Sequence, residues 1–139
     1  MPLDKPRPHV FVAEDDPATL DLLVTRLGVA GYSVSYARDG QEAVNMILNS
    51  RPNAAILDVN MPLLDGFGVM RTLRDNPAIA GRIPIMVLTA RNSPEDVQRA
   101  IQLGARDFLS KPFKDAQLLD RVARLLRAPP VAAKPTVYV

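Results

Sequence analysis

Short runs of apolar residues alternate along the chain with longer stretches in which apolar residues recur at helical spacing. Three of the runs are apolar at consecutive positions, as expected of parallel strands that are covered on both faces. The run at 32–37 alternates instead, with Tyr32, Val34 and Tyr36 on one side, and this pattern favours a strand at the edge of a sheet. The predicted strands are 9–13, 32–37, 54–57, 83–88 and 107–109.

Helix-start signals stand between these runs. Asp16 before Pro17, and Ser93 before Pro94, place an N-cap residue ahead of a proline in the first helical turn. The five predicted helices begin after Asp16, Asp39, Asp65, Ser93 and Asp115, and the first should end at Gly28 or Gly31. The order is (βα)5, which predicts an α/β fold: a doubly wound, five-stranded parallel sheet with helices on both faces.

Length and composition fit one domain. The chain has 139 residues, 47% hydrophobic and 23% charged, with 13 prolines. Proline and alanine are concentrated at the ends, so we expect a flexible tail at 1–8, one domain at 9–127, and a Pro/Ala-rich tail or linker at 128–139.

Several classes of protein are disfavoured at this stage. The chain has no cysteine, which removes disulfide scaffolds, thiolate metal sites and cysteine nucleophiles. It has no apolar run near the roughly 20 residues of a membrane span and no signal-peptide pattern, so a cytoplasmic protein that does not contact membranes is expected. The formal charge of +2 arises in the tails, and a balanced body gives little support to nucleic-acid binding.

Polar side chains follow four of the predicted strands. They are Glu14 and Asp15 after the first, Asp58 after the third, Thr89 after the fourth and Lys111 after the fifth. The carboxyl ends of parallel strands share one edge of the sheet, where ligands of such folds bind. Crowded carboxylates raise each other's pKa, and a hard cation such as Mg²⁺ relieves this. With a lysine and a hydroxyl added, the group indicates phosphoryl chemistry at a carboxylate.

Each residue also has a structural explanation. Acids before Pro17 are often only helix caps, Asp58 suits a turn, Thr89 suits a buried hydroxyl bonded to backbone, and Lys111 suits a solvated loop. The joint occurrence of all of them at strand ends of one sheet makes a purely structural origin improbable.

Four segments together resemble the receiver domain of two-component response regulators, over about 9–127. The segments are 10–17, 57–66, 87–90 and 108–113. The resemblance implies a flavodoxin-like strand order, 2-1-3-4-5. It also implies a signalling switch that catalyses only its own phosphorylation and dephosphorylation, rather than an enzyme.

The resemblance implies a role for each pocket residue. Asp58 would accept a phosphoryl group from a sensor histidine kinase, a phosphotransfer protein or a small phosphodonor. Mg²⁺ would be bound by Glu14, Asp15, Asp58 and the backbone carbonyl of Asn60. In the family, Glu14 occupies a position that is more often Asp.

Other positions would respond to the phosphoryl group. Thr89 would hydrogen-bond it, Lys111 would form a salt bridge to it from a cis bond to Pro112, and Phe108 would rotate inward as the switch. Asn60 and Arg91 would tune its lifetime.

The fourth helix, fifth strand and fifth helix would form the output surface. Asp107 and Arg121 fall where related transcription factors carry charges that pair across a symmetric dimer. The charges that could extend this network are Asp120, Arg124 and Arg127, whereas Arg106 stands where an acid is usual. A homodimer and docking of a downstream protein or output domain both remain open.

Three alternatives remain beside this interpretation. A haloacid-dehalogenase-like phosphatase needs an acid two residues after its nucleophile, and that position is Asn60. A dinucleotide-binding domain needs a glycine fingerprint where this chain has Glu-Asp-Asp-Pro. A phosphorylation-independent pseudo-receiver, a binding module, would require a lost pocket residue, and every expected one is present.

Overall fold

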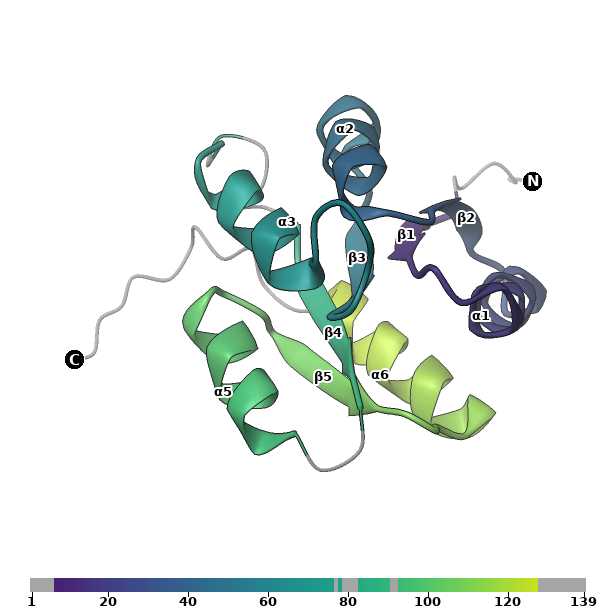
Figure 1. Cartoon of the computed structure of the whole chain (residues 1–139). Helices are drawn as coiled ribbons and strands as arrows, with labels where there is room; N and C mark the ends of the chain where they lie inside the picture. The colour runs from purple at the N-terminus through teal and green to yellow at the C-terminus, as the bar shows by residue number, and fades with distance from the viewer. Residues whose placement is uncertain (1–6, 77, 79–82, 91–92, 128–139) are drawn as a thin grey trace.

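The computed structural model describes residues 7–76, 78, 83–90 and 93–127. In this part of the chain, parallel strands form one five-stranded sheet in the order β2-β1-β3-β4-β5 (Figure 1). The elements are β1 (His9–Ala13), α1 (Pro17–Val29), β2 (Ser33–Ala37), α2 (Gly40–Ser50), β3 (Ala54–Asp58), α3 (Gly66–Arg74), β4 (Ile85–Thr89), α5 (Pro94–Gln102), β5 (Asp107–Ser110) and α6 (Asp115–Arg127). The predicted α/β class and strand order are confirmed.

Apolar side chains alternate between the two faces of the sheet. Helices α1 and α6 cover one face, and α2, α3 and α5 cover the other (Figure 1). In β1, for example, Val10 and Val12 pack toward α1 and α6, whereas Phe11 packs toward α2 and α3. The central strands β1, β3 and β4 are therefore buried on both faces, as their continuous apolar runs predict.

Strand β1 has the predicted bounds, and the ends of the other strands differ from the predictions by at most two residues. The largest shift is in β4, which begins at Ile85 rather than at residue 83. Pro84 has no N–H to donate to a strand partner, although its carbonyl accepts a bond of 3.0 Å from the Ala55 N–H. The prediction of β2 as an edge strand is confirmed.

The predicted caps at Asp16 and Asp39 form, and Asp65 caps the helix that it was expected to precede. The side chains of Asp16, Asp39 and Asp65 accept bonds of 2.8–2.9 Å from the backbone N–H three residues on. The helix start predicted at Ser93 is confirmed, because α5 begins at Pro94 with Ser93 as its N-cap residue, but the Ser93 side chain makes no capping bond and its ψ of 66° departs from the extended geometry of the other three. Asp115 is the first residue of α6 instead of its cap.

The predicted tails, 1–8 and 128–139, lie outside the described residues except for Arg7 and Pro8, which are exposed. None of the helices in the described ranges combines the length and hydrophobicity that a membrane span requires.

Candidate functional site

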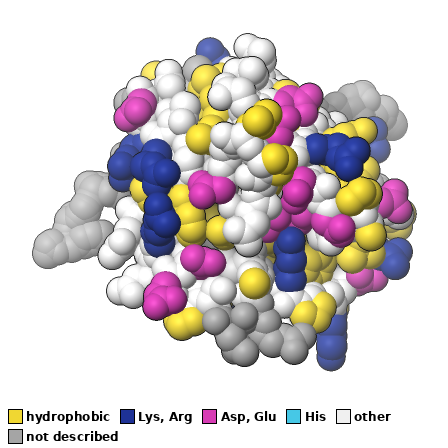
Figure 2. All heavy atoms as spheres, in the orientation of Figure 1, with side chains coloured by type: hydrophobic (Ala, Val, Ile, Leu, Met, Phe, Trp, Pro, Cys, Tyr) yellow, Lys and Arg dark blue, Asp and Glu magenta, His cyan; other side chains and the backbone are white. Residues whose placement is uncertain are grey.

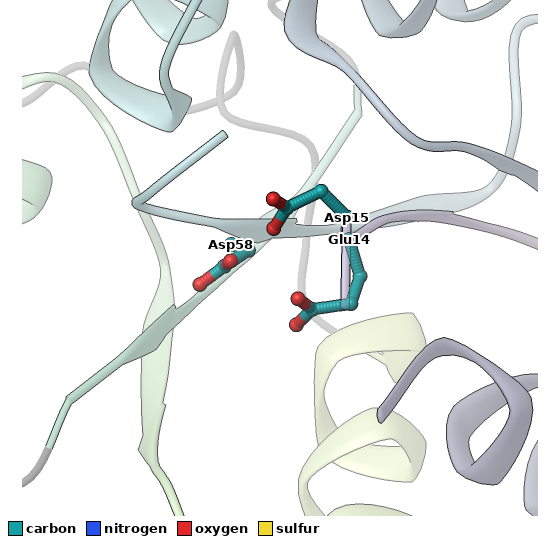
Figure 3. Close-up of side chains that lie close together, drawn as sticks. All are labelled: Glu14, Asp15 and Asp58. Atoms are coloured by element: carbon teal, nitrogen blue, oxygen red, sulfur yellow. The ribbon is translucent and has the colours of Figure 1, made fainter. Parts of the chain in front are cut away.

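Three carboxylates converge at the carboxyl edge of the sheet. Glu14 and Asp15 directly follow β1, and Asp58 is the last residue of β3. One oxygen from each lies within 4.8 Å of the others (Figure 3). Glu14 and Asp58 are buried and Asp15 is half-buried. Figure 2 shows acidic side chains gathered near the middle of this face of the molecule.

Lys111 connects two of these acids. Its Nζ lies 2.9 Å from Glu14 Oε1 and 3.1 Å from Asp58 Oδ1. Its backbone N–H donates to the Thr89 carbonyl at 2.8 Å, which joins the end of β5 to that of β4. The Lys111–Pro112 bond is cis, as expected. Burial opposes the charge of Lys111, but the bond to Glu14 and the charge of Asp58 outweigh it, so the pKa of Lys111 is raised.

Asp58 is in an environment that disfavours its charge. Burial, and next the negative charge of Glu14, raise the pKa of Asp58 to about 6, while Lys111 acts in the opposite direction. One ammonium group therefore does not fully compensate the acids around it. A divalent cation is the kind of ligand that would restore the ionised carboxylate.

Thr89 places a hydroxyl at the same edge. The residue is 1% exposed, and its Oγ1 has no hydrogen-bond partner within the described part of the chain. A buried hydroxyl without a partner is costly. The carboxylate oxygens fit a hard cation, and the free hydroxyl fits an oxygen-rich group bound beside it, so the residues present suit both Mg²⁺ and a phosphoryl group.

Two hollows flank the cluster. Asn60 lines one of about 450 Å³ together with Asp15, Met61, Pro62 and Asp65. The other, of about 350 Å³, is lined by Lys111 and by Thr19, Leu22, Ala90, Pro112 and Phe113. Asp15 is thus reachable from the first hollow and Lys111 from the second.

Asp16 stands apart from the cluster. Its side chain accepts from both the N–H and the hydroxyl of Thr19, at 2.9 and 2.7 Å, and this bonding lowers the pKa of Asp16. Its own N–H donates to Glu14 Oε2 at 3.1 Å. Asp16 therefore caps α1 and orients Glu14.

The charged residues that were predicted to lie at an interface form ion pairs within the chain. Arg121 Nη1 lies 2.7 Å from Asp107 Oδ1 and donates to the Phe108 carbonyl at 2.9 Å. Arg124 pairs with Asp120 at 2.7 Å along α6. Phe108, the predicted switch residue, is half-buried in β5. Arg91 lies outside the described residues.

A cation–π contact joins α5 to α3, and the sequence does not predict it. The Arg99 guanidinium of α5 lies 4.4 Å from the centre of the Phe67 ring of α3. This contact links α5, the helix after β4, to α3, the helix after β3. The two residues are far apart in sequence, and no local pattern indicates that they meet.

Fold and site together define a small doubly wound α/β protein with an acidic, lysine-bridged pocket at the carboxyl edge of its sheet. The family model described as "Response regulator receiver domain" matches residues 10–123, and the chain belongs to this family of signalling proteins. The resemblance found in the sequence is therefore confirmed.

Relatives and solved structures agree with this assignment. Response regulator MprA of Mycobacterium sp. (strain KMS) is 45% identical over 119 residues, which are 86% of this chain and 50% of the relative. Transcriptional regulatory protein PrrA of Mycobacterium tuberculosis is 42% identical over 120 residues, again 86% of this chain and 50% of the relative. The chain thus spans about half the length of these curated relatives.

Among solved structures, a putative response regulator from Chloroflexus aurantiacus superposes with a TM-score of 0.83 at 33% identity, covering 89% of this chain and 100% of its own. The receiver domain of sensor histidine kinase PA1611 from Pseudomonas aeruginosa gives a TM-score of 0.81 at 31% identity, covering 88% of this chain and 99% of its own. That second structure has a magnesium ion coordinated in its active-site cleft.

Proposed function

We propose that this chain is a phosphorylation switch in which Asp58 accepts a phosphoryl group from the phosphohistidine of a sensor histidine kinase or a phosphotransfer protein. The observation that carries the proposal is the position of Asp58: a buried acid at the end of β3, in contact with Lys111 and beside Glu14 and Asp15. Such a partner would be met in the cytoplasm.

Mg²⁺ is the proposed cofactor. Glu14, Asp15, Asp58 and the backbone carbonyl of Asn60 would hold it, a set of oxygen donors that magnesium prefers. Bound there, the ion supplies positive charge to the phosphoryl oxygens. The magnesium ion in the cleft of the related PA1611 receiver supports this assignment.

The transfer itself requires little from the protein except position and charge. An Asp58 carboxylate oxygen attacks phosphorus, the phosphorus–nitrogen bond of the donor breaks, and its electron pair stays with the imidazole. Lys111, already 3.1 Å from Asp58, would balance the negative charge on the transferred group, and Thr89 would donate its hydroxyl to a phosphoryl oxygen.

The signal would then reach the surface formed by α5, β5 and α6. Movement of Thr89 toward the phosphoryl group would leave space into which the half-buried Phe108 rotates. Asn60 and Arg91 would set how long the phosphoryl group persists. The surface would then bind a second copy of this chain, a downstream protein or an output domain.

Intact-protein mass spectrometry tests the proposal. Incubation with acetyl phosphate and Mg²⁺ should add one phosphoryl group to the wild-type chain and none to Asp58→Asn. Asp21→Asn, on the exposed face of α1, is the matched control and should be modified like the wild type. An adduct that persists in Asp58→Asn, or that forms equally well with chelator, contradicts the proposal. A wild-type chain that is never modified favours a pseudo-receiver binding module.

A further inference from the structure

The loop between β3 and α3, residues 59–65, carries Asn60 and forms one wall of the acidic site. Its base is closed by a bond of 2.9 Å from the Gly66 N–H to the Val59 carbonyl. Its tip is a tight turn in which the Leu64 N–H donates to the Pro62 carbonyl at 2.7 Å. Leu63, at the centre of the turn, has a φ of 69° and is 83% exposed.

Gly40, the first residue of α2, lies against this tip. Its N–H faces the Pro62 carbonyl at 3.4 Å. A Cβ on Gly40 would lie 1.8 Å from the Leu64 carbonyl oxygen and 2.6 Å from the carbonyl carbon. Gly40 does not have a positive φ, so backbone freedom does not explain the glycine. What it provides is space for the backbone of the loop.

Helix α2 and the tip of the loop, the two sides of this contact, differ in how many of their side chains are buried in the core. Helix α2 is anchored in the core by Ala43, Val44 and Ile47, which are all buried. Within the tip of the loop, residues 62–64, Pro62 and Leu63 are exposed and Leu64 is partly buried, and the nearest buried anchor is Met61. A methyl group at position 40 meets backbone, which cannot rotate away as a side chain can, so the loop is the side that must shift.

We propose that Gly40 is a positioning residue: it allows the 59–65 loop to sit against α2 and so keeps Asn60 in place beside Asp15 and Asp58. This inference rests on the proposed function, since it assumes that the carboxylates and Asn60 bind Mg²⁺. Gly40 touches none of the carboxylates and acts only through the loop.

Calorimetric titration of the full chain with Mg²⁺ tests the inference. We expect Gly40→Ala to weaken Mg²⁺ binding about tenfold or more, the loss typical of changes to the groups that orient metal ligands. Gly28→Ala is the matched control, because nothing lies within 4 Å of a Cβ at that helical glycine, and its affinity should equal that of the wild type. Val122→Ala, on the buried side of α6, should lower the urea midpoint and leave Mg²⁺ affinity unchanged.

A measurement on the wild-type chain covers the case in which Gly40→Ala does not fold. In amide NMR spectra, Mg²⁺ should shift the Gly40 signal and leave that of Gly28 in place. If Gly40→Ala binds Mg²⁺ as tightly as the wild type, the inference is overturned and the proposed function stands. The same conclusion follows if the Gly40 signal does not move although Mg²⁺ binds. A wild-type chain that does not bind Mg²⁺ overturns both.

Discussion

Asp58, Glu14 and Lys111 form the charged centre of this molecule. That these side chains meet could be predicted from the sequence, because each follows a strand of a parallel sheet and such ends share one edge. That Lys111 bridges both acids could not be predicted, since side-chain geometry and the burial that raises the pKa of Asp58 depend on the assembled fold.

The raised pKa of Asp58 predicts a pH-dependent cost to stability. Its ordinary value is 3.8 and its value in the fold is about 6, so the charged form is disfavoured by folding. The cost is absent below pH 4, grows as the pH rises toward 6, and is complete above it. In magnesium-free buffer at pH 8, Asp58→Asn should raise the free energy of unfolding by on the order of 2 kcal/mol.

Urea unfolding at pH 4 and pH 8 provides the measurement. The gain should be large at pH 8 and small at pH 4. Asp120→Asn is a suitable control, because Arg124 lowers the pKa of that exposed carboxyl and its removal should give no gain at pH 8. An equal gain for Asp58→Asn at both pH values would show that ionisation of Asp58 is not the cause.

At the scale of single elements, the sequence patterns predicted which strands and helices exist better than they predicted the exact ends and caps of those elements. The buried strands β1, β3 and β4 stand out because both of their faces are apolar. The predicted starts of α1, α2, α3 and α5 are confirmed and three of them are capped by aspartate side chains, whereas the Ser93 side chain makes no capping bond to α5. A cap depends on the backbone angles of the residue as well as its type, and these angles are set by how the preceding loop enters the helix.

The different outcomes at Asp39 and Ser93 predict different costs of substitution. Asp39→Ala removes a bond of 2.8 Å to the Glu42 N–H and should lower the free energy of unfolding by about 1 kcal/mol. Ser93→Ala removes no capping bond, and its effect should be close to zero. Urea denaturation of both variants measures the difference. A cost at Ser93 that matches the cost at Asp39 would mean that the hydroxyl does cap α5.

At the scale of the whole molecule, the proposed output surface combines β5 with the helices α5 and α6 on either side of it. Arg121 reaches from α6 to Asp107 and to the Phe108 carbonyl, so the charges predicted to pair between copies are engaged inside one copy. This arrangement depends on how α6 packs beside β5, which local sequence patterns do not reveal. A dimer across this face would have to exchange these partners or share them.

Light scattering, which measures the mass of the protein in solution, tests that surface when it is done with and without Mg²⁺ and beryllofluoride, a phosphoryl mimic. We expect the mimic to double the mass of the wild-type chain, and Arg121→Glu to stay monomeric, because a two-fold interface repeats the introduced repulsion. Arg51→Glu is the control and should dimerise like the wild type, because this exposed residue ends α2, which packs on β1 and β2 rather than at the β5 edge of the sheet. A wild-type monomer in both states, well above micromolar concentration, assigns the surface to docking of a different protein.

The burial of the central strands on both faces also determines how slowly different parts of the molecule open. Amide protons of β1, β3 and β4 lie between two apolar layers, so we expect them to exchange with solvent only when the whole chain unfolds. Asp58 and Thr89 are the last residues of two of these strands. The Asp58 carboxylate and the Thr89 hydroxyl therefore belong to the part of the protein that should open most slowly, and faster local motions are expected in the loops and the outer strands around them.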